Sequence, residues 1–176
     1  MPDPLVVAFV PGVVPDKWQR VWNERMPHPL VLAPRQQAEA LAALRERSIH
    51  MALLREVSRD DGLHAIPLYR ERPVVVAPRD SPVAAFEELR LAELAGEPRV
   101  EGHEPAMTLE LVAAGAGIAI LPMSLARLHA RRDVVARPLT DAPDTGIALV
   151  WPIEAPHPLA EAFIGIVRGR TARSSR

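Results

Sequence analysis

The sequence of 176 residues contains no cysteine, which excludes disulfide bonds, thiol catalysis and thiolate metal sites. It also lacks an excess of charge, because 21 lysines and arginines nearly balance 22 aspartates and glutamates. A formal net charge of −1 gives no general attraction to nucleic acid or to an anionic membrane. Its content of apolar residues, 48%, is sufficient for a buried core in one compact domain or two small lobes.

The amino terminus lacks the features of a targeting segment. The segment M-P-D-P-L-V-V-A-F-V-P-G has neither the basic residues of a signal peptide nor an apolar run long enough to span a membrane. We therefore expect a cytoplasmic protein with no membrane partner.

Familiar catalytic motifs are also missing. The sequence has no Walker A, H-E-x-x-H or G-x-S-x-G motif, and Gly115 and Gly117 follow a helical pattern without the third glycine of a dinucleotide-binding loop. The histidines, at positions 28, 50, 64, 103, 129 and 157, do not have metal-ligand spacing. The best local cluster, His103 with Glu101 and Glu104, is more readily explained as surface residues. We expect no catalytic residues, no metal and no cofactor.

The first third of the chain alternates between strand and helix patterns. Apolar runs predict strands at 5–10, 30–33 and 49–54, and helical spacing predicts helices at 15–26 and 36–47. This order is typical of parallel βαβ units, whose ligands bind outside the carboxyl ends of the strands. Three segments are therefore expected to converge there, namely Pro11–Val14, Pro34–Gln37 and Arg55–Glu56.

The remaining chain predicts further short elements. Extended runs lie at 63–69 and 73–78, helical patterns at 86–94, 124–131 and 157–168, and strands that return to the sheet at 134–138 and 146–151. Within the first helix, Trp18 and Trp22 form one aromatic stripe. This stripe favours packing against the sheet, with an exposed partner-binding face as the alternative.

The segment Thr108–Pro122, T-L-E-L-V-A-A-G-A-G-I-A-I-L-P, predicts a helix joined to a short strand through two glycines. By itself this is an ordinary helix–strand unit. Its amino-acid sequence, followed by M-S-L-A-R, resembles the second-domain segment of the effector-binding domain of LysR-type transcriptional regulators. The segments L-H-A-I-P-L-Y-R-E-R-P-V-V-V-A-P-R-D-S-P-V-A and L-A-E-L-A-G-E-P resemble the same family. The resemblance implies an α/β, type 2 periplasmic-binding-protein-like fold.

The connection 97–107 departs from this family pattern. Relatives place a strand, a helix and another strand there, and these eleven residues have room for at most one strand, around 99–101. We therefore expect a parallel-sheet main lobe (1–80 and 132–168), a hinge with a reduced second lobe (81–131) and a basic flexible tail (169–176). The chain also begins at the effector domain, without the family's winged helix-turn-helix, so we expect a stand-alone domain.

The resemblance also indicates a ligand site. The segment M-A-L-L-R-E is similar to the family's D-I-G-x-x-R strand end, so Arg55 is expected to contact a ligand carboxylate, with an ion pair to Glu56 as the alternative. The first and second strand-end loops lack the Ser and Thr hydroxyls that many relatives have there, and the backbone amides of Val13 and Val14, together with Gln36 and Thr108, are expected to replace them. The predicted ligand-binding residues are Pro11, Gly12, Val13, Val14, Arg35, Gln36, Arg55, Met107 and Thr108.

Two functions remain open. The first is a domain that senses a small, anionic effector and acts in transcriptional regulation through a partner, such as another regulator. The second is a module of the same fold that has lost its ligand and works through protein contacts. The resemblance implies a homodimer, with Trp18, Val21, Trp22, Leu125 and Leu128 at its interface. The arginine-rich tail would add only weak, non-specific affinity for nucleic acid.

Overall fold

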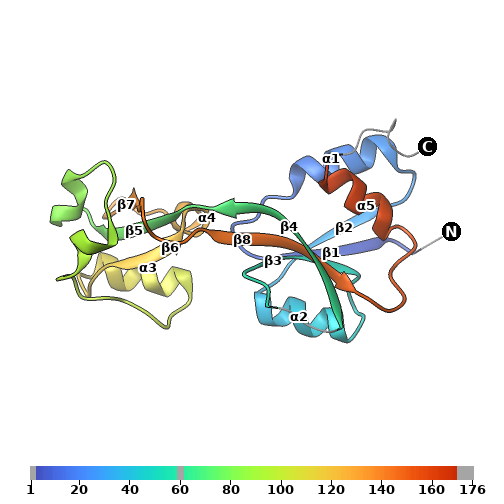
Figure 1. The fold of residues 1–176 in the computed structure, drawn as a ribbon, viewed down its shortest axis with the longest axis horizontal. Helices are drawn as coiled ribbons and strands as arrows, with labels where there is room; N and C mark the ends of the chain where they lie inside the picture. The colour runs from blue at the N-terminus through green and yellow to red at the C-terminus, as the bar shows by residue number, and fades with distance from the viewer. Residues whose placement is uncertain (1–2, 59–61, 170–176) are drawn as a thin grey trace. The chain divides into compact units, whose positions relative to one another are not determined.

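The computed structural model describes residues 3–58 and 62–169, which form two compact units (Figure 1). Unit 1 runs to Tyr69 and resumes at Gly146, and unit 2 is Arg70–Thr145. Within the described ranges, none of the helices has the length and apolar character needed to cross a membrane. Residues 170–176, most of the predicted basic tail, lie outside the described residues.

Unit 1 is built on a five-stranded sheet of order β2-β1-β3-β8-β4. The strands are β1 (Leu5–Phe9), β2 (Leu30–Pro34), β3 (Met51–Arg55), β4 (Leu63–Glu71) and β8 (Thr145–Pro152). The helices are α1 (Asp16–Arg25), α2 (Gln37–Arg45) and α5 (Ala160–Val167). β1 pairs in parallel with β2 and with β3, as the strand–helix order predicts, and β8 runs antiparallel to β3.

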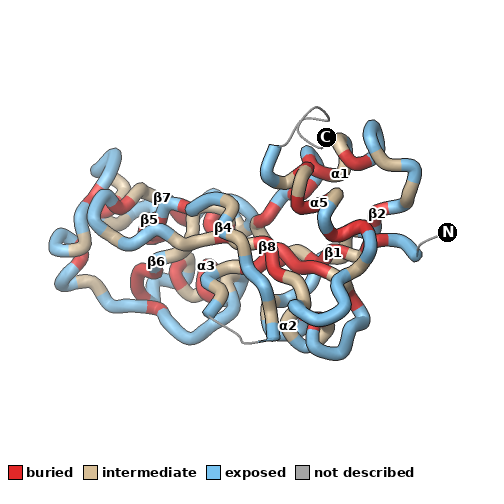
Figure 2. The backbone as a smooth tube through the Cα atoms, turned by 45° about the vertical axis from the view of Figure 1, so that its right-hand side comes forward, coloured by how far each residue is buried: buried red, intermediate tan, exposed pale blue. Residues whose placement is uncertain are grey.

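The sheet of unit 1 is covered on both faces. Figures 1 and 2 show α1 and α5 together on one face and α2 on the other. The central strand β3 is therefore buried along Met51–Leu54, which explains its uninterrupted apolar sequence.

Trp22 joins the two helices of the first face. Its ring lies 5.9 Å from the ring of Phe163, and its indole N–H donates a 2.6 Å hydrogen bond to the carbonyl of His28. Trp18 is also buried. The expectation that both tryptophans pack inside their own domain is confirmed. Their place at the interface of a homodimer stays a prediction, and little of either side chain is exposed for it.

Unit 2 is built on a three-stranded antiparallel sheet of order β6-β5-β7. Its strands are β5 (Pro73–Pro78), β6 (Ala119–Pro122) and β7 (Val134–Pro138). Its α-helices are α3 (Pro105–Ala113) and α4 (Met123–Leu128), and its 3₁₀ helices are η1 (Pro82–Ala85) and η2 (Leu91–Leu94). Alternate residues of β5 face two small cores: Val74 and Val76 lie with the residues of α3 and α4, and Val75 and Ala77 with those of η1 and η2.

The limits of unit 2 differ from the expected second lobe, 81–131. Both β5 and β7 were assigned to the main lobe, and β7 was expected to return to the first sheet. Instead β7 pairs with β5, with Val76 opposite Ala136, so both strands belong to unit 2. The helix expected at 86–94 is also shorter. Only Leu91–Leu94 is helical, and its first amide donates to the carboxylate of Asp141 at 2.8 Å.

The glycine turn fixes the short connection onto β6. Ile118 donates to Pro98 O and accepts from Val100 N–H, both at 2.8 Å, and a single bridge between Arg99 and Ile118 is what remains of the strand expected there. A Cβ on Gly117 would overlap Pro98 O and lie 2.9 Å from Pro98 C. The close approach of the two backbones therefore requires glycine at this position.

Candidate functional site

The carboxyl ends of β1, β2 and β3 meet at one edge of the sheet of unit 1. Val10 N–H donates to Leu53 O at 3.2 Å, and Arg35 N–H donates to Phe9 O at 3.1 Å, so the parallel pairing continues to the strand ends. The loops after these three strands therefore lie side by side, as the sequence predicts.

Arg55 links these loops. It ends β3, and its guanidinium Nη2 donates to the carbonyl of Pro11, after β1, at 3.1 Å. Its backbone N–H donates to Gln37 Oε1 at 2.9 Å, and Gln37 Nε2 donates back to Arg55 O. Side-chain and backbone contacts thus hold this half-buried arginine at the meeting point of the three loops.

The Glu56 carboxylate does not form the alternative ion pair with Arg55. Glu56 has a positive φ of 46°, and its backbone N–H donates to Gly146 O at 2.9 Å. Its carboxylate accepts a hydrogen bond from Gly146 N–H. Glu56 therefore binds the start of β8.

The loop after β1 offers a ligand fewer backbone N–H donors than the sequence predicts. Gly12 has a φ of 88°, and Val13 N–H donates to Val10 O at 3.2 Å, so this amide closes the turn. The side chain of Val13 is buried, whereas Val14 is 68% exposed. The loop therefore presents an apolar side chain next to the contact between Pro11 and Arg55.

The loop after β2 contributes charge. Arg35 and Gln36 are both exposed, and Gln36 N–H donates to the carboxylate of Glu39 at 3.4 Å at the start of α2. Arg35 is therefore a second cation at this edge of the sheet, directly after β2, the strand that pairs with β1.

The other two predicted residues belong to α3 in unit 2. Met107 is 47% exposed, and Thr108 is 3% exposed. The hydroxyl of Thr108 is close to two carbonyls at the start of its own helix, the N-cap Glu104 O at 3.1 Å and the preceding His103 O at 3.3 Å. A hydroxyl has one proton to donate, so in this arrangement Thr108 does not supply the donor that the sequence assigned to it.

Gln37 is the residue at this site that sequence analysis did not single out. It was expected only as part of the converging segment 34–37, and both polar atoms of its side chain bind the backbone of Arg55. Its position at the start of α2, three residues after the end of β2, was the available signal. Elsewhere, His103, Glu101 and Glu104 are all exposed, and the described ranges contain no set of three or more acidic or histidine side chains arranged to hold a metal ion.

Comparison with known proteins identifies the family. The model of the LysR substrate binding domain matches residues 17–104 and 98–172. The chain belongs to this family, whose members are effector-binding domains of transcription regulators. The two matches overlap at residues 98–104, inside the connection 97–107. No curated protein matches the sequence.

Solved structures share the fold. A mutant of Corynebacterium glutamicum OxyR, bound to H2O2, has 22% identity and a TM-score of 0.75, over 96% of this chain and 68% of that one. The BenM effector binding domain with its effector benzoate has 17% identity and a TM-score of 0.77, over 98% and 93%. A mutant of the OxyR regulatory domain from Pseudomonas aeruginosa has 19% identity and a TM-score of 0.72, over 100% of both chains. The predicted periplasmic-binding-protein-like α/β fold is confirmed.

Proposed function

We propose that this chain senses a small anionic effector at the carboxyl ends of β1, β2 and β3, and that it acts in transcriptional regulation through a partner. The observation that carries the proposal is the fixed position of Arg55, whose contacts with Pro11 and Gln37 join all three loops. A guanidinium has five N–H donors, and a carboxylate or phosphate can accept two of them side by side.

The surroundings of Arg55 favour a ligand with both a charge and an apolar part. Arg35 supplies a second cation, and Val14 supplies an exposed apolar side chain. The described loops after β1 and β2 carry no hydroxyl donors, so recognition of the charge of the ligand depends mainly on the arginines. The similar BenM domain binds benzoate, a small carboxylate with an apolar ring, which has this character.

The partner that carries the signal is part of the proposal. Family resemblance favours a homodimer, and the burial of Trp18 and Trp22 leaves Val21 and Leu128 as the better exposed of the expected interface residues. Leu128 is 54% exposed at the end of α4. A ligand-free interaction module is the second candidate, and the commitment of the Thr108 hydroxyl to its own helix favours it.

A thermal-shift screen tests the proposal. Wild type, Arg55→Ala and Arg55→Lys are compared against benzoate, aliphatic carboxylates, amino acids and phosphorylated metabolites. A ligand at a hundred times its dissociation constant stabilises the native state by about 2.7 kcal/mol. We expect stabilisation by one class of anion, lost in Arg55→Ala and weakened in Arg55→Lys, because lysine keeps the charge and loses the planar donor pair.

Arg20→Ala is the matched control, because Arg20 is exposed on α1 and its replacement changes the net charge by the same amount. A flat response of the wild type to every class of anion would overturn effector sensing and favour the interaction module. An equal loss in Arg20→Ala would show a general charge effect instead of a site.

A further inference from the structure

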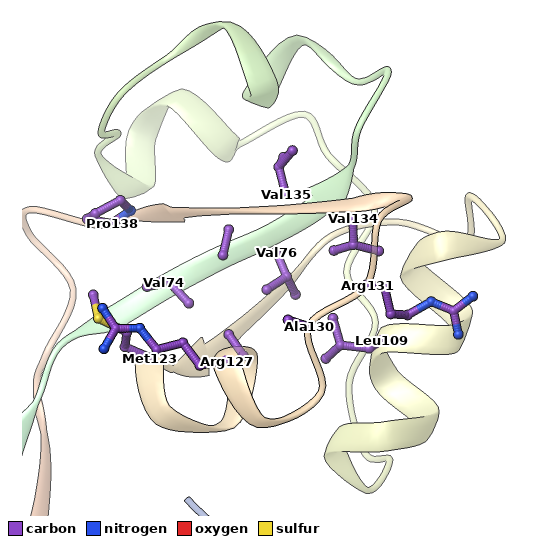
Figure 3. A pocket seen from close by; sticks show the side chains of 12 residues that line it. Val74, Val76, Leu109, Met123, Arg127, Ala130, Arg131, Val134, Val135 and Pro138 are labelled. Carbon is purple, nitrogen blue, oxygen red and sulfur yellow. The ribbon is translucent and has the colours of Figure 1, made fainter.

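Unit 2 contains a pocket of about 320 Å³ that has no role in the proposed effector site (Figure 3). Its walls come from two strands and two helices of the same unit. β7 contributes Val134, Val135, Ala136 and Pro138, and β5 contributes Val74 and Val76 from the face that carries α3 and α4. The pocket is therefore an apolar hollow over one face of the three-stranded sheet.

The length and composition of α4 create this hollow. The helix has only six residues. The pocket lining from this helix and the turn that follows it includes two small side chains, Ala126 and Ala130. Alanines four residues apart leave the space above Val76 unfilled, whereas larger side chains would close it. The volume falls in the range of small-molecule sites, which are concave, mostly apolar and carry few polar groups.

Two arginines supply the polar groups of this pocket, at opposite ends. Figure 3 shows Arg127 with Met123 and Pro138 at one end, and Arg131 at the other. Arg131 is already paired, because its Nε and Nη2 donate to the two carboxylate oxygens of Asp133 at 2.9 and 3.0 Å. Arg127 is exposed, and no carboxylate among the described residues forms an ion pair with it.

We propose that this pocket binds a small amphipathic acid, with its hydrocarbon part against Val74, Val76 and Ala136 and its anionic group on Arg127. An apolar body fits the lining, and one negative charge matches Arg127, which forms no ion pair with a carboxylate of residues 3–58 or 62–169. A volume of about 320 Å³ suits a single small molecule better than a helix or strand of another chain. This site is separate from the proposed effector site and does not depend on it.

The test titrates ¹⁵N-labelled protein with octanoate and, separately, with octan-1-ol, which has the same chain without the charge. We expect saturable shifts of the amides of Val76, Ala130 and Ala136 with octanoate, and roughly tenfold weaker binding of octan-1-ol, since a charge-assisted hydrogen bond is lost. Arg127→Gln is expected to weaken octanoate binding by a similar factor. Arg132→Gln is the matched control, because it removes the same charge outside the pocket lining.

Two further variants fill the pocket from different sides. Ala130→Trp enters from the turn after α4 and Ala136→Phe from β7, and both positions are exposed, so a larger side chain can be placed there without opening the core. Each is expected to abolish the octanoate shifts while the circular dichroism spectrum without ligand stays that of the wild type. Two variants are used so that failure of one to fold still leaves a test.

Several results would overturn the site in unit 2. These are the absence of saturable octanoate binding, binding that survives both filling variants, and shifts confined to the loops after β1, β2 and β3. The last result would place octanoate at the effector site of unit 1. A wild-type dimer that Ala130→Trp dissociates, with no response to octanoate, would instead identify the pocket as a contact between copies of this chain.

Discussion

Replacement of Gly117 by alanine should selectively damage unit 2. Its φ of 151° is disfavoured for any residue with a Cβ, and the new Cβ would overlap Pro98 O and lie 2.9 Å from Pro98 C. Backbone must therefore move, and the two 2.8 Å hydrogen bonds between Ile118 and the short connection lie at that point. Backbone strain costs about 1–3 kcal/mol and each lost hydrogen bond about 1 kcal/mol, so the expected loss of stability is about 3–5 kcal/mol.

Gly115→Ala is the matched control. Gly115 also has a positive φ, 83°, but a Cβ there would meet nothing within 4 Å. Only the backbone preference is lost, so we expect a cost of about 1–2 kcal/mol.

The assay must report on unit 2. All three tryptophans, at 18, 22 and 151, lie in unit 1, so intrinsic tryptophan fluorescence follows the other unit. Urea unfolding followed by far-ultraviolet circular dichroism, with hydrogen exchange of the Val100 and Ile118 amides, measures the relevant part of the chain. Equal losses in the free energy of unfolding for Gly115→Ala and Gly117→Ala would refute this prediction, because the close approach to Pro98 would then not affect stability.

Three further predictions concern unit 1. The neutral Nδ1 of His50 accepts a 2.9 Å hydrogen bond from Val6 N–H, and burial, followed by the nearby His157 charge, lowers the pKa of His50, with Asp3 opposing. The unfolded chain therefore binds this proton more readily, so the free energy of unfolding should fall as pH falls below the unfolded histidine value of about 6.5. His50→Asn should flatten that part of a pH series of urea unfolding curves, and an unchanged slope would contradict the assignment. Gln37→Ala should lower affinity for the effector by about tenfold with Arg55 intact, because it removes both side-chain contacts with the Arg55 backbone. An unchanged affinity in isothermal titration would contradict this role. Trp22→Phe should cost about 1–3 kcal/mol in urea unfolding, because the carbonyl at residue 28 loses its indole donor, and a stability equal to wild type would contradict it.

The sequence was most informative where one local pattern determines one structure. The apolar runs at 5–10, 30–33 and 49–54 predicted the strands β1, β2 and β3, and the strand–helix order predicted the meeting of Pro11, Arg35 and Arg55 at one sheet edge. Both follow from short-range periodicity and from the geometry of parallel sheets. The family could also be predicted from the sequence, because the residues around the glycine turn at 115–117 form a distinctive motif.

The pairing of strands and the hydrogen-bond partners of side chains could not be predicted in the same way. The pattern of Val134–Pro138 predicts a strand, but nothing local to it selects β5 over the first sheet as its neighbour. Thr108 was expected to face a ligand, and its hydroxyl instead binds the carbonyl four residues earlier, an option open to any threonine in a helix. The pocket of unit 2 also escaped prediction, because it arises from the small volume of Ala126 and Ala130 opposite a sheet whose pairing was not known.

The most direct test of the central proposal is isothermal titration of wild type, Arg55→Ala and Arg20→Ala with the anion that gives the largest thermal shift. The account predicts one saturable site in the wild type and in Arg20→Ala, and at least a tenfold loss of affinity in Arg55→Ala, since a charge-assisted contact contributes about 1.5–3 kcal/mol. Equal affinity in all three proteins would contradict it, because a ligand held at the ends of β1, β2 and β3 must depend on the arginine that joins them.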